Sequence, residues 1–201
     1  MIVLGLTGGI GMGKSTAARM FRAMHVPVHD SDATVHRLMA KGGAAVAAVS
    51  REFPGVERNG AIDRAALGAK VFADPPALRR LERILHPLVG VAERRFLRIM
   101  RGRRAPLVVL DIPLLFETAA EQRCDAVVLV TAPPFLQRAR VLARPNMTAD
   151  RFEAVLAKQM PDPHKRRAAH YIVPSGLGRA VTFRRLRRIV RELMKAPGDP
   201  S

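Results

Sequence analysis

The chain has 201 residues, with 34 Lys and Arg against 17 Asp and Glu, for a formal net charge of +17. Hydrophobic residues make up 48% of it and charged residues 25%, which is the composition of a globular domain and excludes a disordered chain. A single cysteine, Cys124, excludes an internal disulfide and favours a reducing, cytoplasmic location. No apolar run approaches the ~18–20 residues of a membrane span, and Met1–Leu6 lacks a basic flank, so we expect neither a membrane span nor a signal peptide.

The basic residues are concentrated in the second part of the chain. Residues 1–78 carry 9 basic and 6 acidic side chains, a net +3, whereas residues 79–201 carry 25 and 11, a net +14. This excess favours a polyanionic partner, and nucleic acid, an anionic membrane surface and a small phosphorylated ligand all satisfy it. Composition does not choose among them.

The chain opens with a strand that the pattern predicts to be buried. Met1–Leu6 is apolar without alternation, as in a strand covered on both faces. Pro27 favours an edge position for a second, short strand, and Asp30 suits the start of a helix. The elements predicted here are a strand at 1–6, a helix at 14–24, a strand at 26–29 and a helix at 30–39.

Residues 44–104 are predicted to be mostly helical. Asn59-Gly60 predicts a turn, and Asp63 and Asp74 suit the N-caps of helices. Pro87 is expected to break or kink the longest of these helices. The predicted helices cover 44–53, 63–72 and 74 to about 100.

The remaining third alternates strands with helices. Strands are predicted at 107–110, 126–130 and 171–173, helices at 135–143, 148–159 and 179–195, and a frayed tail at 196–201. Such alternation predicts an α/β fold with a parallel sheet of about five strands flanked by helices. Ligands of these sheets bind at the carboxyl ends of the strands.

The most specific motif follows the first strand. Gly8-Gly9-Ile10-Gly11-Met12-Gly13-Lys14-Ser15 matches G-x-x-x-x-G-K-[ST], the phosphate-binding loop of P-loop NTPases. Glycines let backbone N–H groups turn towards a phosphate at the start of a helix. Lys14 can then reach the β- and γ-phosphates, and the Ser15 hydroxyl can bind Mg²⁺. The strand before the motif and the helix after it are the context that supports this interpretation.

The length and the other motifs narrow the class of nucleotide chemistry. A GTPase should carry Asn-Lys-x-Asp for guanine, and the sequence has none. A helicase or large ATPase needs a longer chain. A compact kinase that phosphorylates a small molecule fits the length.

Three carboxylates are candidates for the chemistry. Asp32 follows the second strand and is our candidate for the general base that accepts the proton of the acceptor hydroxyl. Asp30 is interpreted as a helix cap. Asp111 ends a buried strand, where it either holds the water shell of Mg²⁺ or caps the turn before Pro113. Glu117 lies six residues further on, in the loop that follows this strand.

Arginines follow the fourth predicted strand. Arg140 and Arg144 are four residues apart and are expected to share a helical face. Planar guanidinium groups suit the charge of a transferring phosphoryl group. Arg138 is interpreted as part of a solvated basic face. The segment 145–147 is a candidate hinge for a closing lid.

At this point the sequence resembles the dephospho-CoA kinase family over nearly its whole length. The residues that carry the resemblance are Leu6–Thr16, Asp30-Ser31-Asp32, Leu85-His86-Pro87-Leu88, Pro113–Glu117, Gln137 with Arg140 and Arg144, and Gln159 with Lys165-Arg166. The resemblance implies transfer of the ATP γ-phosphate to the 3′-hydroxyl of dephospho-CoA, giving CoA and ADP, with Mg²⁺ as cofactor. This reaction is the last step of coenzyme A synthesis.

The resemblance also implies roles for single residues and segments. It implies catalytic roles for Asp32, Lys14 and Arg140, metal binding by Ser15, and substrate binding by His86, Asp111 and Glu117. The residues that it implies for ATP binding are Gly9, Gly11, Met12, Gly13, Lys14, Ser15, Thr16 and Arg144. The single domain is expected to comprise a nucleotide-binding core at 1–32 and 105–195, a helical substrate-side region at 33–104 and a lid at about 144–168.

Two alternatives remain open. The arginines of the last predicted helix favour a nucleic-acid-binding module, although aromatic residues for base stacking make up only 4% of the chain. We expect no specific nucleic acid and no membrane as partner. The other alternative is a different small-molecule kinase, such as a nucleoside monophosphate kinase.

Overall fold

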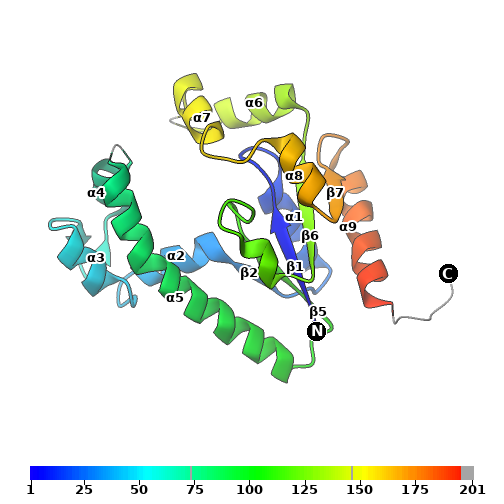
Figure 1. The fold of residues 1–201 in the computed structure, drawn as a ribbon, viewed down its shortest axis with the longest axis horizontal. Helices are drawn as coiled ribbons and strands as arrows, with labels where there is room; N and C mark the ends of the chain where they lie inside the picture. Colours follow the sequence, from blue (N-terminus) through cyan, green and yellow to red (C-terminus); the bar gives the residue numbers. More distant parts are fainter. Residues whose placement is uncertain (73, 146, 196–201) are drawn as a thin grey trace. The chain divides into compact units, whose positions relative to one another are not determined.

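The computed structural model describes residues 1–72, 74–145 and 147–195 (Figure 1). The chain forms two compact units: residues 1–29 together with 100–201, and residues 30–99. The frayed tail predicted at 196–201 and Asn146 of the candidate hinge lie outside the described residues. No helix among the residues described is both long and apolar enough to cross a membrane.

The first unit is built on a five-stranded sheet in the order β2-β5-β1-β6-β7. Its strands are β1 (Ile2–Thr7), β2 (Val28–Asp30), β5 (Leu107–Asp111), β6 (Ala126–Thr131) and β7 (Tyr171–Pro174). The pairs β1–β5, β1–β6 and β6–β7 are parallel, with Leu4 opposite both Val109 and Ala126. The predicted parallel sheet is confirmed. Strand β2 lies at an edge, as Pro27 predicts, and the Val109 N–H donates to the Pro27 carbonyl at 2.9 Å.

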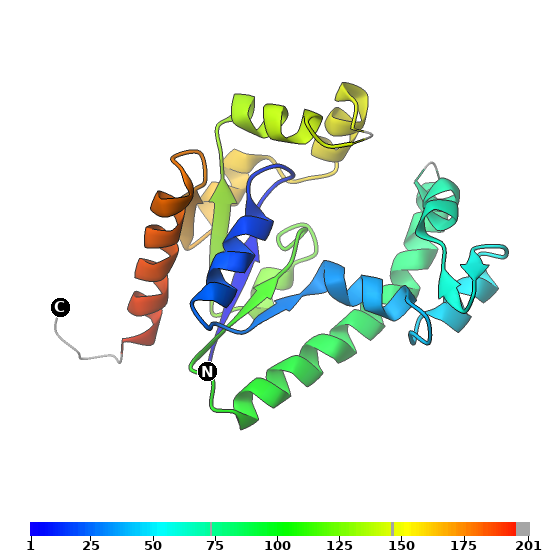
Figure 2. The same ribbon diagram turned by 180° about the vertical axis from the view of Figure 1, so that it is seen from behind.

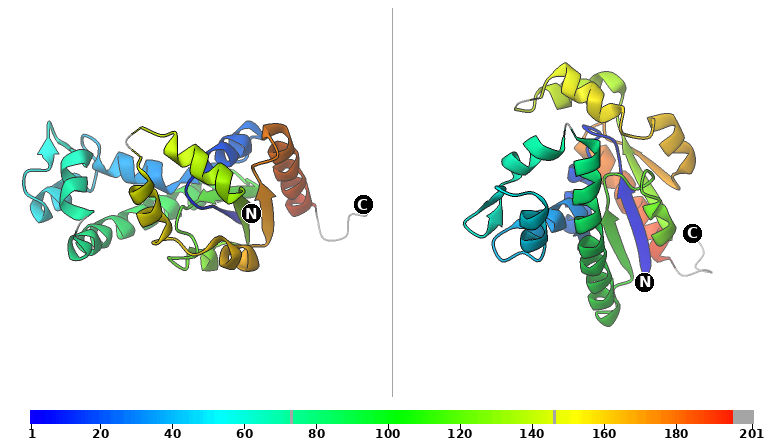
Figure 3. Two further views of the ribbon diagram at one scale, coloured as in Figure 1. Left: turned by 90° about the horizontal axis from the view of Figure 1, so that it is seen from above. Right: turned by 60° about the vertical axis from the view of Figure 1, so that its left-hand side comes forward.

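Helices cover both faces of this sheet (Figures 2 and 3). Helices α1 (Lys14–Ala23) and α9 (Arg179–Met194) lie on one face, and α8 (Asp162–Ala168) lies on the other. Helices α6 (Pro134–Leu142) and α7 (Ala149–Leu156) and the 3₁₀ turn η1 (Ala120–Arg123) complete the unit. Its core joins fully buried side chains of three elements, with Leu4 from β1, Phe21 from α1 and Leu186 from α9. This burial fixes the phosphate loop between a rigid strand and a rigid helix.

The second unit is helical and has its own apolar core. Its elements are α2 (Ser31–Met39), α3 (Val46–Glu52), a hairpin of β3 (Glu57–Arg58) and β4 (Ala61–Ile62), α4 (Arg64–Val71) and most of α5 (Pro75–Gly102). Val49, Phe53 and Leu81 are among the buried side chains of this core. The turn predicted at 59–60 closes the hairpin, with φ of 53° and 78° at its two residues.

The local signals for helix starts are confirmed. Of the break or kink expected at Pro87, the break is wrong, and the kink stays a prediction. Asp63 accepts from the Ala65 and Ala66 N–H groups, and Asp74 accepts from the Ala77 N–H. Helix α5 is continuous from residue 75 to 102 with Pro87 inside it. A proline removes one backbone hydrogen bond. Apolar side chains on both sides of Pro87, Leu85 and Leu88, pack with the core of the unit and hold the helix together.

Candidate active site

The phosphate loop has the conformation that its glycines predict. Gly11 and Gly13 have φ of 73° and 96°, in the left-handed region that favours glycine. The Thr16 and Ala17 N–H groups donate to the Gly13 carbonyl, so the helix starts directly after the loop. No side chain among the described residues caps this helix. The first-turn N–H groups and the positive end of the helix are therefore available to an anion.

Lys14 and Asp111 form an ion pair beside the loop. Lys14 Nζ lies 2.6 Å from Asp111 Oδ1, and the two side chains are 15% and 4% exposed. Strands β1 and β5 are neighbours, and Leu6 lies opposite Asp111, which explains why the two charges meet. Asp111 therefore positions the ammonium group that is expected to reach the phosphates of a nucleotide.

Ser15 offers a hydroxyl oxygen at the start of α1. Its side chain is exposed and, within the described part of the chain, makes no hydrogen bond. A free hydroxyl on the first turn, with the Asp111 carboxylate at the neighbouring strand end, provides the oxygen ligands that Mg²⁺ prefers. Residues 1–72, 74–145 and 147–195 hold no cluster of three His, Cys, Asp or Glu side chains that could bind a metal ion. The residues present therefore fit a magnesium ion that arrives with a nucleotide.

Arg140 holds the other side of the loop. Its guanidinium group donates to the Gly11 carbonyl at 3.4 Å and to Oγ and the carbonyl oxygen of Ser175 at 2.9 and 3.0 Å. The Ser175 hydroxyl in turn donates to the Met12 carbonyl at 2.6 Å. Arg140 thus connects α6, the loop after β7 and the phosphate loop.

The other two arginines of this region lie apart from that network. Helix α6 ends at Leu142, so Arg144 lies beyond it and is exposed. The helical face that Arg140 and Arg144 were predicted to share is therefore not formed. Arg138 is half exposed and pairs with Glu153 at 3.1 Å.

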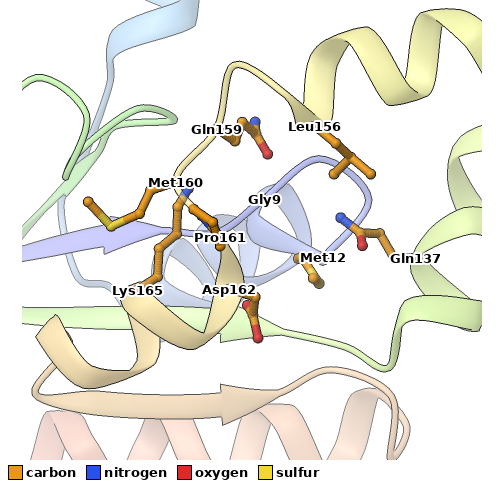
Figure 4. A pocket seen from close by; sticks show the side chains of 9 residues that line it. All are labelled: Gly9, Met12, Gln137, Leu156, Gln159, Met160, Pro161, Asp162 and Lys165. Carbon is orange, nitrogen blue, oxygen red and sulfur yellow. The ribbon is translucent and has the colours of Figure 1, made fainter.

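Two glutamines hold the tip of the phosphate loop, and sequence reasoning gave them no role. The Ile10 N–H donates to Gln159 Oε1 at 3.1 Å, and Gln137 Nε2 donates to the Ile10 carbonyl at 2.8 Å. The N–H and the carbonyl of Ile10, which belong to two successive peptide groups, are thus both held by side chains, one from α6 and one from the segment after α7 (Figure 4). Both glutamines are among the residues that carry the family resemblance, and that resemblance is the signal from which a role for them could have been predicted.

A buried ion pair lies next to these glutamines. Lys165 Nζ lies 2.8 Å from Glu117 Oε1, and the Met160 N–H donates to the same oxygen at 2.8 Å. Burial alone raises the pKa of Glu117, but the hydrogen bonds from Lys165 and Met160 outweigh it and lower this pKa below its ordinary value. Glu117 therefore anchors the segment 160–165 as a carboxylate.

Asp30, Asp32 and His86 belong to the second unit, whereas the phosphate loop belongs to the first. Asp30 is the N-cap of α2 and accepts from the Ala33 N–H at 2.9 Å, as predicted. Asp32 lies in the first turn of α2 and is exposed, with no hydrogen bond or ion pair to any described residue. His86 is exposed on α5.

The parallel sheet, the phosphate loop between β1 and α1, and the lysine, serine and arginine around that loop define a P-loop kinase. The family model described as "Dephospho-CoA kinase" matches residues 2–177. The chain therefore belongs to the dephospho-CoA kinase family.

Individual relatives agree with this assignment. A protein named "Dephospho-CoA kinase" from Paramagnetospirillum magneticum is 68% identical over 166 residues, which cover 83% of this chain and 78% of the relative. The crystal structure of TT1252 from Thermus thermophilus has a TM-score of 0.82 at 37% identity and covers 97% of this chain and 98% of that one. A dephospho-CoA kinase structure from Campylobacter jejuni has a TM-score of 0.67 at 20% identity, covers 96% of this chain and 98% of that one, and shares the fold.

Proposed function

We propose that the chain transfers the γ-phosphoryl group of ATP to the 3′-hydroxyl of dephospho-CoA, giving CoA and ADP. The observation that carries this proposal is the phosphate loop with Lys14 held beside it, in a chain of the dephospho-CoA kinase family. We assign this ATP-consuming reaction to the cytoplasm.

The phosphate loop and two cations stabilise the charge of the transferring group. The phosphates of ATP bind along the segment from Gly9 to Thr16, where N–H groups of the loop and of the first turn of α1 donate to them; the Ile10 N–H, which donates to Gln159, is not one of these donors. Lys14 and Arg140 offset the negative charge that spreads over the phosphoryl oxygens in the transition state. Ser15 would hold a magnesium ion, which would supply further positive charge to the phosphates of ATP.

Asp32 is the general base in this proposal. A base has to accept a proton from the acceptor hydroxyl, so its oxygens must be free of competing donors. Asp32 meets this requirement, whereas Asp30 is engaged as a helix cap. Asp32 therefore accepts the hydroxyl proton as the acceptor oxygen bonds to phosphorus.

The other segments bind and enclose the substrates. We assign Arg144 to the adenine of ATP, and the helical region at 33–104, with His86 inside it, to dephospho-CoA. Asp111 and Glu117 act by positioning, because each is engaged by a lysine. The described residues of 144–168 act as the lid that excludes water during transfer.

An assay of ADP release tests the proposal. The purified chain is incubated with ATP, Mg²⁺ and dephospho-CoA, and in parallel with AMP, CMP or shikimate as acceptor. We expect turnover with dephospho-CoA and a product heavier by one phosphoryl group in mass spectrometry. Turnover with AMP, CMP or shikimate but not with dephospho-CoA would assign the chain to another class of small-molecule kinase.

A further inference from the structure

Helix α9 carries a row of arginines that takes part in no step of the proposed reaction. An α-helix has about 3.6 residues per turn, so residues spaced by three and four share a face. The exposed arginines with this spacing, which we call the α9 stripe, are Arg184, Arg187, Arg188 and Arg191. Leu186, Ile189 and Val190, on the opposite face, are buried in the core. The core therefore holds the helix and leaves the α9 stripe to solvent.

The charge of the α9 stripe is not neutralised by its surroundings. None of its guanidinium groups forms an ion pair or a hydrogen bond with another described residue. Helix α1, which packs against α9 on the same face of the sheet (Figure 2), adds three basic residues and no acidic one. Glu192 is the one acidic residue of the two helices, and it accepts from the Tyr171 hydroxyl at 2.9 Å. A basic row of this kind along a helix is the electrostatic feature that attracts a polyanion.

The chemistry of the α9 stripe distinguishes among anionic partners. A helix that binds a lipid surface inserts its apolar face, but the apolar face of α9 is buried in the protein. Single-stranded nucleic acid needs aromatic side chains on which its bases stack, and Phe183, the aromatic residue of α9, packs against the core. An acidic protein would bind around aromatic or apolar anchors, and the α9 stripe has none. The stripe therefore fits a partner that is bound through its phosphates alone.

We propose that the α9 stripe binds double-stranded DNA through the phosphates of its backbone, without reading the base sequence. Guanidinium groups donate paired hydrogen bonds to phosphate oxygens and carry no acceptor, so they cannot accept from the 2′-hydroxyls of RNA. From Arg184 to Arg191 the stripe is about 10 Å long, at about 1.5 Å per residue. The major groove of B-DNA is about 12 Å wide. The two ends of the stripe therefore reach phosphates on both sides of this groove.

Fluorescence anisotropy with a short labelled DNA duplex tests the proposal on the unaltered chain. Four phosphate contacts predict that log Kobs falls with log salt concentration with a slope of about −3 to −4. We expect the same Kd for a second duplex of unrelated sequence, and a weaker Kd for single-stranded DNA and for an RNA duplex of the same length. A Kd that does not change with salt, or equal or tighter binding of either competitor, would overturn the proposal. Binding to vesicles that contain phosphatidylserine, without binding to DNA, would also overturn it.

Substitution separates the α9 stripe from the positive charge of the whole chain. The stripe variant combines Arg184→Gln, Arg188→Gln and Arg191→Gln. The matched control removes the same charge with the same spacing from exposed positions of α5, as Arg94→Gln, Arg98→Gln and Arg101→Gln. We expect the stripe variant to bind the duplex about tenfold more weakly or worse, with a slope smaller by about 3, and the control to stay within about threefold of the wild type. Equal losses in the two variants would overturn the proposal.

The phosphate loop is the alternative place at which a polyanion could bind, so competition with ATP completes the test. Saturating ATP and Mg²⁺ at matched ionic strength should leave the Kd of the duplex unchanged. Displacement of the DNA by ATP would place it at the phosphate loop and overturn the proposal. Both variants should keep the urea midpoint of the wild type, because exposed arginines without partners contribute little to stability. DNA binding is measured without turnover, so its outcome does not depend on the proposed reaction.

Discussion

Lys165 and Glu117 form an ion pair at 2.8 Å in which the lysine side chain is only 2% exposed. The pair joins α8 to the loop after β5, and the Met160 N–H adds a hydrogen bond to the same carboxylate. A buried charge is tolerated only with a partner, because its removal from water is costly. The arrangement of the segment that borders the phosphate loop therefore depends on both residues.

Glu117→Gln should destabilise the fold strongly. The substitution leaves the Lys165 ammonium buried beside a neutral amide, and breaking a buried pair in this way costs about 3–5 kcal/mol. The free energy of unfolding from urea titrations measures the effect. The double variant Glu117→Gln with Lys165→Met should recover part of the loss, because no buried charge remains. A Glu117→Gln chain as stable as the wild type would show that the pair contributes nothing to the fold.

The same carboxylate makes stability depend on acid pH. The pKa of Glu117 in the folded chain lies below its ordinary value of 4.5, because the bonds from Lys165 and Met160 outweigh burial. Its stabilising contribution is therefore complete above that ordinary value and is lost as the pH falls through the lowered pKa of the folded chain. We expect the free energy of unfolding to fall less steeply between pH 5 and pH 3 in Glu117→Gln than in the wild type. Parallel profiles would exclude this contribution.

Asp32→Asn should remove catalysis and keep ATP binding. The amide cannot accept the hydroxyl proton, and we expect kcat to fall about 10²-fold or more. Asp30→Asn is the matched control two residues away, because asparagine caps a helix as well as aspartate does. The control should keep both stability and kcat. Steady-state kinetics with ATP and dephospho-CoA, together with the Kd of ATP, measure the difference, and a near-normal kcat in Asp32→Asn would remove Asp32 from the role of base.

The parts of the site that are local in sequence were predicted from it. The apolar run of β1, the glycine spacing and Lys14 lie within one short segment, so their arrangement follows from local rules. Helix α8 was not predicted, because its seven residues are mostly polar or charged and show no apolar period. Its buried face carries Lys165, whose partner Glu117 is far away in the sequence.

The contacts of the two glutamines with the phosphate loop could not be predicted from the sequence for the same reason: their partners are far away in the sequence. Gln137 and Gln159 meet at Ile10 only after the sheet has formed, and no periodicity indicates such a meeting. The network of Arg140 with Ser175 likewise joins distant segments. Side-chain contacts over long sequence separations are therefore the part of this site that the sequence did not reveal.

Arg140→Met should lower the rate far more than Arg138→Met. Arg140 contacts the phosphate loop and Ser175, and the proposed reaction places a phosphoryl group beside it. Loss of one such cation typically costs about 10²–10³ in kcat. Arg138, two residues away on the same helix, pairs with Glu153 at the surface, and its substitution should leave kcat within about twofold. Equal losses of kcat in the two variants would show that the rate depends on the basic charge of α6 and not on the position of Arg140.

Gly11 and Gly42 have the same φ of 73°, which makes them a matched pair for testing the packing of the phosphate loop. A Cβ at Gly42 would meet nothing within 4 Å, whereas one at Gly11 would meet Val141 Cγ2 at 2.5 Å and the Gln137 carbonyl oxygen at 2.9 Å. Gly42→Ala should therefore cost only the left-handed strain, about 1–2 kcal/mol. Gly11→Ala should add about 1–3 kcal/mol of overpacking.

The Gly11 variant should also weaken ATP binding, because relief of the contact with α6 requires the loop to move away from its position over the start of α1. Urea titrations of the two alanine variants measure the stability difference, and calorimetry measures the Kd of ATP. If Gly42→Ala weakens ATP binding as much as Gly11→Ala, general destabilisation explains the loss. If only Gly11→Ala does so, the contact between the loop and α6 is required for the nucleotide site, since φ is the same at both positions.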